Sequence, residues 1–437
     1  ICACLVGSEM CIRDRFLEKL VQETEKEHED ILEQADETDA VFGELYRWYL
    51  RNPEYRSRVQ KLVQSAFAGK PKDIISQSVA KALYGEVSPY SATRLERFAA
   101  CAFAHFLQYG MKLTERVEYE FKPMDMGNVM HEALESFAEE VRKRGMKWTE
   151  LTEQERNEIA DRCLDNIVAD YGNTVLKSSA RNEYMIERTR RILRRTVWAL
   201  QKQLEQGEFQ PEGFEVTFGG GRIDRVDIME DQNKVYVKVI DYKTGNTSFD
   251  LVYLYHGLQL QLMIYLDGAL RVEQKKYPDK EIIPAGVFYY NIKDPMIQEK
   301  IDADVEAVSA GLMKELKMNG LVQADPELVY RMDSSLGSIP VAFNKDGSFR
   351  KNSSVADRTQ FAVLGRYVRT KIEKIRSSIL EGDAEVSPYE LGKKNACTYC
   401  PYMTVCGFDR RLSGYEFRRL KNFSDEELWK AFDREAE

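Results

Sequence analysis

Two acidic residues and a lysine stand at the ends of two predicted strands in the middle of the chain. In the segment KVYVKVIDYKTG, alternation along a strand places Asp241 and Lys243 on the same face as Val235, Val237 and Val239. Asp224 lies in the preceding predicted strand, and Asp227 lies on the opposite face of that strand, where we expect a structural or salt-bridged role. Carboxylate oxygens are good Mg²⁺ ligands, and a bound divalent cation near an ammonium group suits phosphodiester hydrolysis. For Asp-x-Lys alone, a cross-strand salt bridge at a sheet edge is the structural alternative.

Two further motifs flank these strands in the sequence. Upstream, His131 follows Gly127 in a G-x-x-x-H pattern on a predicted helix, so its imidazole could supply a nitrogen ligand to a metal. Downstream, Gln261 and Tyr265 are one helical turn apart, so they share one face of another predicted helix. The order of these pieces strengthens the hydrolase hypothesis over the isolated salt bridge.

Three cysteines near the C-terminus form a C-x₂-C-x₅-C pattern at Cys397, Cys400 and Cys406. Disulfides conflict with the cytosolic character of the composition. Structural zinc is a serious alternative because it also takes four cysteines, although zinc sites usually show two paired motifs. A triplet with one distant partner suits a [4Fe–4S] cluster. Cys163 lies on an ordinary helical segment, and we interpret it as a buried apolar residue.

The totals agree with a water-soluble globular protein. The chain has 437 residues and a formal net charge of −9, which argues mildly against a surface that coats nucleic acid nonspecifically. The sequence contains no run of about 18 apolar residues, so it predicts no membrane span. The first residues also lack the pattern of a secretory signal. We therefore expect a cytoplasmic protein.

The first residues carry a warning of their own. The segment LVGSEMCIRDR, residues 5–15, resembles one reading frame of a sequencing adaptor. On this interpretation residues 1–15 are an artefact, Cys2, Cys4 and Cys11 leave the cysteine count, and natural sequence begins near Phe16.

Hydrophobic periodicity predicts an α/β fold. Helical, charged sequence runs from Phe16 to about Lys81, and Ser88 and Ser91 are candidate N-caps of the next helix. A helix is predicted over residues 126–144, followed by two more through Gln206. A β-rich block begins near Phe214, and after it we predict a helix over 255–270, a strand in IPAGVFYYNI, a polar insertion over 325–357 and a long helix over 359–380.

The motifs GxxxH, GRID, IDYKTG and QxxxY, in this order, resemble the RecB-like branch of the PD-(D/E)XK nucleases. The resemblance implies a restriction-endonuclease-like core, a small mixed sheet flanked by helices with helical additions. It makes Asp224 and Asp241 metal ligands, joined by His131 and the carbonyl group of Tyr242, and Lys243 the catalytic lysine. It implies that Gln261 and Tyr265 shape the site and contact the DNA strand.

Within that branch, the chain is similar to the AddB type from about residue 86 to 412. The features are a cysteine before the GxxxH helix, the segment IPVAFNKDGSF and the ending PYELG…CTYCPYMTVCGFD. The resemblance implies that Cys101, Cys397, Cys400 and Cys406 hold a [4Fe–4S] cluster that clamps the two ends of the module. Ala102 departs from the proline expected after the first cysteine.

This type implies a Mg²⁺-dependent exonuclease that cuts the 5′-ended strand during double-strand break repair, paired with an AddA-type helicase subunit. We then expect a remnant of a helicase-like domain over residues 16–85, the nuclease domain with its cluster over 86–412, and a helical extension over 413–437. The rivals are a stand-alone iron–sulfur exonuclease of the Cas4 type and a silent DNA-binding scaffold.

An arginine-rich stretch offers a possible path for DNA. Its side chains could track phosphates toward the metal site, or they could form a solvated basic face paired with nearby acids. The residues are Arg188, Arg190, Arg191, Arg194 and Arg195.

Overall fold

A computed structural model describes residues 37–66, 74–85, 91–114, 123–170, 179–219, 221–297, 304–411 and 414–436. The chain divides into two compact units, one of residues 1–72 with 410–415, the other of residues 73–409 with 416–437. The adaptor-like residues 1–15 and the candidate N-cap Ser88 lie outside the described residues.

The described part of the smaller unit consists of two helices, α2 (Glu37–Arg51) and α3 (Pro53–Ala66). Asn52 separates them, and its side-chain oxygen accepts a hydrogen bond from the backbone N–H of Glu54 at 3.1 Å. Pro53 occupies the first position of α3, where the missing N–H has no intrahelical partner to lose. The helical pattern predicted for this region is therefore confirmed over these residues.

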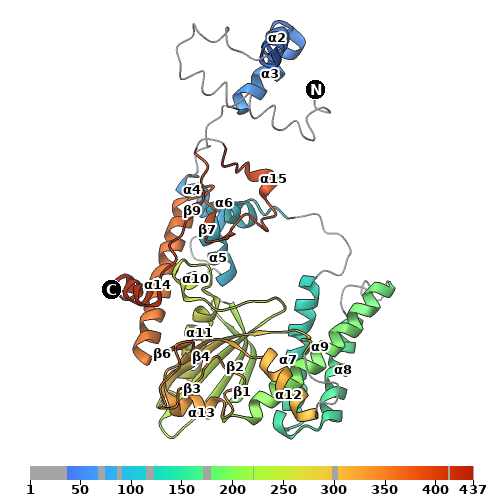
Figure 1. The fold of residues 1–437 in the computed structure, drawn as a ribbon, viewed down its shortest axis with the longest axis vertical. Helices are drawn as coiled ribbons and strands as arrows, with labels where there is room; N and C mark the ends of the chain where they lie inside the picture. Colours follow the sequence, from blue (N-terminus) through green and yellow to red (C-terminus); the bar gives the residue numbers. More distant parts are fainter. Residues whose placement is uncertain are drawn as a thin grey trace. The chain divides into compact units, whose positions relative to one another are not determined.

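A mixed sheet forms the centre of the larger unit (Figure 1). Its strands lie in the order β1 (Gln210–Phe218), β2 (Gly221–Glu230), β3 (Lys234–Lys243), β4 (Glu281–Asn291), β5 (Asn319–Gln323) and β6 (Val355–Ala356). Neighbours are antiparallel except for the β3–β4 and β5–β6 pairs, which are parallel. The predicted α/β architecture, a small mixed sheet flanked by helices, is confirmed.

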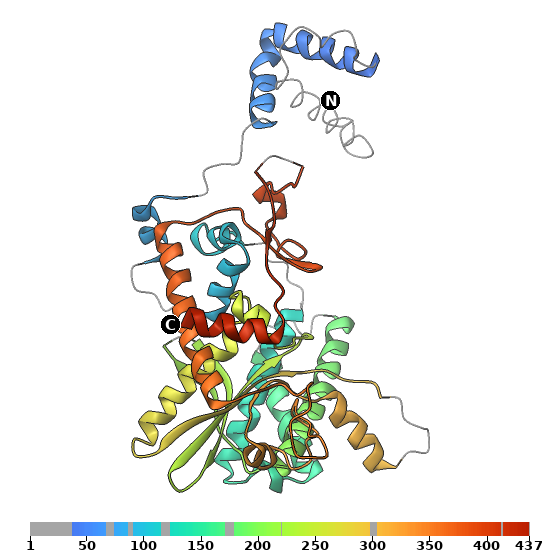
Figure 2. The same cartoon turned by 60° about the vertical axis from the view of Figure 1, so that its left-hand side comes forward.

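One face of the sheet packs against α11 (Gln261–Lys276), and the hydrophobic core on that side continues into α5 (Ala92–Ala100), α4 (Gln77–Tyr84), α14 (Arg358–Glu381) and α16 (Asp425–Ala436). Figure 2 shows α16 beside α14, and Phe432 of α16 is fully buried in this core. The alternation predicted for the central strand holds, because Val235, Val237 and Val239 all enter the same core.

The opposite face packs against α7 (Pro123–Lys143), α8 (Glu153–Asp170) and α9 (Ala180–Glu205). Their apolar stripes meet Ile240, Phe288 and Tyr290 from the sheet. These three helices match the predicted ones closely. None of the helices in the described ranges is long and apolar enough to cross a membrane.

The remaining elements of the larger unit are short. They are α6 (Ala102–His105), the π-helical turn Phe106–Gly110, the 3-10 turn Trp148–Glu150, α10 (Leu251–Tyr255), α12 (Val305–Glu315), α13 (Pro326–Met332), α15 (Met403–Cys406) and a second sheet of β7 (Tyr389–Leu391), β8 (Lys394–Asn395) and β9 (Arg418–Arg419). The polar insertion expected over 325–357 thus contains α13 and β6.

The helix predicted over 255–270 begins later than we expected. The chain forms α10, breaks, and resumes as α11 at Gln261. Gly257 sits in the break with φ +78°, a conformation that favours glycine, and an added Cβ would lie 3.2 Å from Ala99. This correction matters because it places Gln261 in the first turn of α11.

Candidate active site

The two predicted acids meet at one end of the β2–β3 pair. Arg225 of β2 pairs with Ile240 of β3, so the neighbouring Asp224 and Asp241 lie at the same level of the sheet. The Asp224 carboxylate accepts a hydrogen bond of 2.7 Å from the backbone N–H of Tyr242. Both carboxylates are buried, at 7% and 1% exposure. The strands thus hold two acids together that solvent hardly screens.

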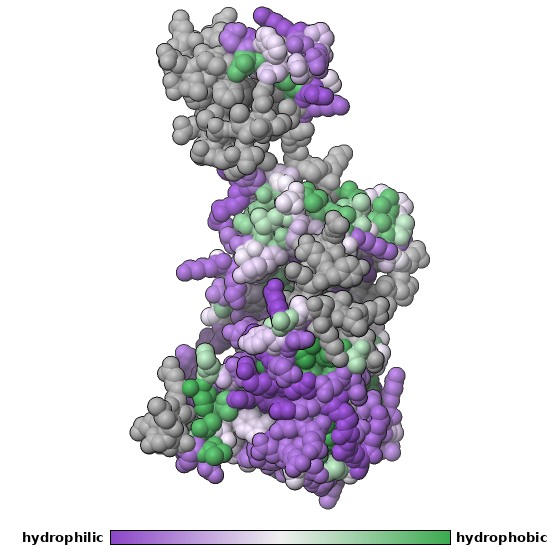
Figure 3. All heavy atoms as spheres, turned by 90° about the vertical axis from the view of Figure 1, so that its right-hand side faces the viewer, coloured by the Kyte–Doolittle hydropathy of each residue, from purple (hydrophilic) through white to green (hydrophobic). Residues whose placement is uncertain are grey.

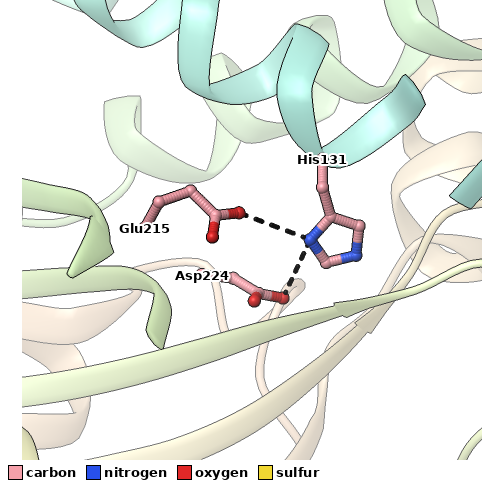
Figure 4. Close-up of side chains that lie close together, drawn as sticks. All are labelled: His131, Glu215 and Asp224. Atoms are coloured by element: carbon pink, nitrogen blue, oxygen red, sulfur yellow. Dashed lines mark ion pairs between the residues drawn. The ribbon is translucent and has the colours of Figure 1, made fainter. Parts of the chain in front are cut away.

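His131 reaches this pair from α7 (Figure 4). Its Nδ1 lies 3.4 Å from Asp224 Oδ2 and 3.6 Å from Glu215 Oε1, and these three side chains can offer ligand atoms within 4.8 Å of one another. On the other side of the ring, Nε2 lies 3.2 Å from the carbonyl oxygen of Tyr242. One nitrogen and two carboxylates therefore converge as a metal site requires, and the Tyr242 carbonyl lies at the other ring nitrogen.

The electrostatics of the cluster favour a bound cation. Burial, together with the negative charge of Asp241, raises the pKa of Asp224 to about 7. Burial also raises the pKa of Asp241. Burial opposes charging of His131, but Glu215 and Asp224 outweigh it and raise the pKa of the imidazole. A divalent cation would stabilise the ionised carboxylates that the fold has crowded together.

Lys243 lies beside the acids and is held on two sides. Its Nζ is 2.5 Å from Asp241 Oδ2, and it donates a hydrogen bond of 2.7 Å to the side-chain oxygen of Gln261. The Gln261 amide nitrogen in turn donates to the Tyr265 hydroxyl at 2.8 Å. The predicted side chains therefore form two groups at the same end of the β2–β3 pair. One is His131 with Asp224, and the other is Asp241 with Lys243, Gln261 and Tyr265.

Glu215 and Glu96 belong to this neighbourhood and were missed from the sequence. Glu215 is on β1, between Phe214, which pairs with Arg225, and Val216, which pairs with Ile223, so it lies across from Asp224. The missed signal was the run of glycines in the sequence after Phe218, because β1 ends at Phe218 and β2 begins at Gly221 within the β-rich block. Glu96, on α5, contacts the start of α11, and no local pattern marks it.

Asp227 lies away from the metal-site cluster, as expected. It forms ion pairs of 2.6 Å with Arg225 and 2.9 Å with Lys238, and it is fully buried. Arg225 also lies over the ring of Trp148, with 5.7 Å from its guanidinium carbon to the ring centroid. This network packs the opposite face of the sheet.

Four cysteines line a second pocket in the larger unit: Cys101, Cys397, Cys400 and Cys406. Burial, together with the other three sulfurs, raises the pKa of Cys397 to about 12. Arg97 donates a hydrogen bond to Cys400 Sγ at 3.9 Å. All four are free cysteines that line the same pocket.

The first of these cysteines stands at a helix junction. Cys101 ends α5 and precedes α6, whose first position is Ala102. Proline is well tolerated at a first helical position, so the helix start is compatible with either residue. Cys163 instead lies in the core between the helices of the opposite sheet face, as expected for a buried apolar residue.

The arginines of α9 are mostly paired with acids. Arg190 is 2.7 Å from Asp165, Arg191 is 2.7 Å from Asp294, and Arg194 pairs with Asp161. Figure 3 shows the strongly hydrophilic surface over α8 and α9. These ion pairs favour the solvated, neutralised face over the phosphate-tracking one.

A protein-family model described as the PD-(D/E)XK nuclease superfamily matches residues 89–407. The chain is also 41% identical over 425 residues to the B subunit of the ATP-dependent helicase/deoxyribonuclease of Lachnoclostridium phytofermentans, with 92% of this chain and 36% of that protein covered. Proteins of the same name are 34% identical in Thermoanaerobacter sp. (92% of this chain, 37% of the relative) and in Clostridium acetobutylicum (91% and 36%). The chain thus spans a little over a third of the length of these curated relatives.

Proposed function

The chain belongs to the PD-(D/E)XK nuclease superfamily, and we propose that it is a Mg²⁺-dependent DNA exonuclease module whose active site is the cluster around Asp224 and Asp241. One observation carries the proposal. His131, Asp224, Asp241 and Lys243 come from three separate elements and meet at one end of the sheet. A salt bridge of Asp241 with Lys243 would need neither His131 nor the second buried acid.

The residues present fit a divalent metal. His131, Asp224, Asp241 and the carbonyl group of Tyr242 would hold it, with Glu215 as a further carboxylate. When bound, the metal would supply a Lewis acid for the phosphate and an activated water. The amino group of Lys243 lies beside the site, and its contacts with Asp241 and Gln261 fix its position.

We further propose that the four pocket cysteines hold a [4Fe–4S] cluster. The supporting geometry is the convergence of Cys101 with the C-terminal triplet. Burial raises the pKa of the Cys101 thiol, and the nearby backbone N–H groups of Ala104, Ser387 and Phe103 offset part of this effect. Hydrogen bonding near the sulfurs is one of the features that tune iron–sulfur clusters. The cluster would have a structural role, since hydrolysis transfers no electrons.

The names of the relatives support a place for this module within a larger enzyme. We propose that it is the nuclease part of an AddB-type subunit, that it works with an AddA-type helicase subunit, and that it cuts the 5′-ended strand while double-strand breaks are processed for repair. The domain assignments proposed with it are a helicase-like remnant over 16–85 and the nuclease with its cluster over 86–412.

The test is cleavage of single-stranded DNA by the anaerobically purified chain with Mg²⁺. We expect wild type to cut and Asp241→Ala to lose at least about a hundred-fold in rate, the upper end of losses seen even for outer-shell partners of metal sites. Asp346→Ala, which removes an exposed acid from a distant turn, is the matched control and should cut like wild type. Equal rates for wild type and Asp241→Ala would refute the assignment.

The same preparation separates the rivals. DNA binding without cleavage by the wild type would favour the scaffold function. Substrates labelled at the 5′ or the 3′ end report the strand polarity, and elemental analysis distinguishes iron from zinc in the cysteine pocket.

A further inference from the structure

A carboxylate from α5 caps the helix that carries Gln261. Glu96 Oε1 accepts hydrogen bonds from the backbone N–H groups of Leu260, at 2.7 Å, and Gln261, at 3.0 Å. The first N–H groups of a helix have no partner within it, and Leu260, at the N-cap of α11, makes no side-chain cap bond. Glu96 therefore supplies from another segment the cap that α11 lacks.

The capped residue is the one that holds the catalytic lysine. Gln261 donates its backbone N–H to Glu96, and its side-chain oxygen accepts the hydrogen bond from Lys243. Two hydrogen bonds thus join Glu96 to Lys243 with one residue between them. A shift at the start of α11 would move Gln261 away from Lys243. Lys243 would then keep only its contact with Asp241.

Burial of the Glu96 carboxylate at the start of α11 is unfavourable for its charged form. Burial raises the pKa of Glu96 to about 7, even though the two backbone N–H bonds and the ammonium group of Lys243 act to lower it. A serine or aspartate at the N-cap itself would satisfy such a helix start with less burial of charge. The remote carboxylate instead joins α5 to α11.

We propose that Glu96 is a positioning residue, which fixes Gln261 and through it the ammonium group of Lys243 for DNA cleavage. The inference rests on the proposed nuclease function. It also assigns a role to α5, because this helix of nine residues carries Glu96 and ends at Cys101. One short helix therefore contacts the start of α11 and also leads into the cysteine pocket.

Three variants and a control test the inference by steady-state cleavage of single-stranded DNA with Mg²⁺. Glu96→Ala removes the acceptor, and Glu96→Asp keeps the charge but is too short to reach both N–H groups. In both, kcat should fall about ten- to a hundred-fold, as expected for a misplaced catalytic group, while KM for DNA and the iron content stay unchanged. Glu96→Gln retains an acceptor oxygen and should restore most of kcat. The control Asp357→Ala removes the N-cap of α14, a long helix of the same core, and should keep kcat.

Wild-type kcat in Glu96→Ala, or a loss confined to KM, would overturn the inference while the proposed function stands. If Glu96→Ala does not fold, the Glu96→Asp variant provides the test. A wild-type kcat in Glu96→Asp would overturn the inference in the same way. If the wild-type protein does not cut DNA, or cuts it only as fast as Asp241→Ala, the proposed nuclease function itself is refuted.

Discussion

Glu215 contributes a carboxylate to the site from a strained position on the edge strand. Its φ is +50°, a region that non-glycine residues seldom adopt, and it lies just beyond an irregularity in the β1–β2 register at Pro211–Gly213. Its second carboxylate oxygen lies 2.5 Å from Arg222 Nε, and the side chain is only 6% exposed. Strain of this kind persists where the surrounding structure enforces it, often at functional sites.

At the residue scale we therefore predict that Glu215→Gln weakens metal binding. The change keeps the shape of the side chain and removes one negative charge from the cluster. Affinity for Mn²⁺, used as the probe ion and measured by calorimetry, should fall at least about ten-fold. Glu212→Gln is the matched control, since Glu212 is on the same strand and pairs with Lys276 away from the site. Equal affinities in both variants would remove Glu215 from the ligand set.

Among the elements, α7 lies next to the loop after β3 at Gly127. A Cβ at Gly127 would lie 3.4 Å from the Thr244 hydroxyl oxygen, which is ordinary contact, so a branched side chain there would press on the Thr244 side chain. The loop follows Lys243 directly, and His131 lies one turn farther along α7. The two residues of the GxxxH motif thus have related roles. The glycine leaves space for the loop beside α7, and the histidine places its imidazole next to the acids.

We predict that Gly127→Val separates α7 from this loop and lowers the cleavage rate about ten-fold or more, because the imidazole moves from the acids. Iron content should not change, since the cysteine pocket is elsewhere in the unit. Gly365→Val is the comparison in α14, where the nearest atom to an added Cβ is Arg369 Nη1 at 4.0 Å. Similar rates for the two variants would show that Gly127 is not needed for the approach.

For the whole molecule, the cysteine pocket joins segments from the two ends of the nuclease domain. Cys101 precedes all of the active-site motifs in the sequence, and the triplet follows them. A cross-link between such distant points restricts the unfolded chain, and its stabilisation grows slowly with the length of the closed loop. The cluster would therefore stabilise the folded nuclease domain, whose sheet holds Asp224 and Asp241.

We predict that Cys400→Ala lowers iron content and the Tm of the protein, the latter by roughly 10 °C. Cross-linking a long loop contributes about 4 kcal/mol, and each kcal/mol shifts Tm by about 2–4 °C in domains of moderate size. Cys163→Ala removes a buried cysteine from a helical core instead, and it should leave the iron content unchanged. Iron loss in both variants, or in neither, would contradict the four-cysteine assignment.

The local sequence was enough for several parts of the site. Period-two alternation placed Val235, Val237 and Val239 with Asp241 on one face of β3, because successive side chains of a strand point to opposite faces. The same rule separated Asp227 from Asp224. The G-x-x-x-H and Q-x-x-x-Y spacings fixed which side chains share a helix face. The α/β fold followed from the predicted elements, and the resemblance to the nuclease family added the small mixed sheet flanked by helices.

Only the tertiary structure showed Glu215 and Glu96 at the site. Glu215 depends on the strand register across the turn between β1 and β2, and Glu96 depends on the packing of α5 against the start of α11. The tertiary structure also showed that the helix carrying Gln261 begins later than predicted, and that arginines of α9 form ion pairs with acids. Periodicity reports which face a residue occupies within its own element. Contacts between elements depend on register and packing across the core, and one sequence read along its length contains neither.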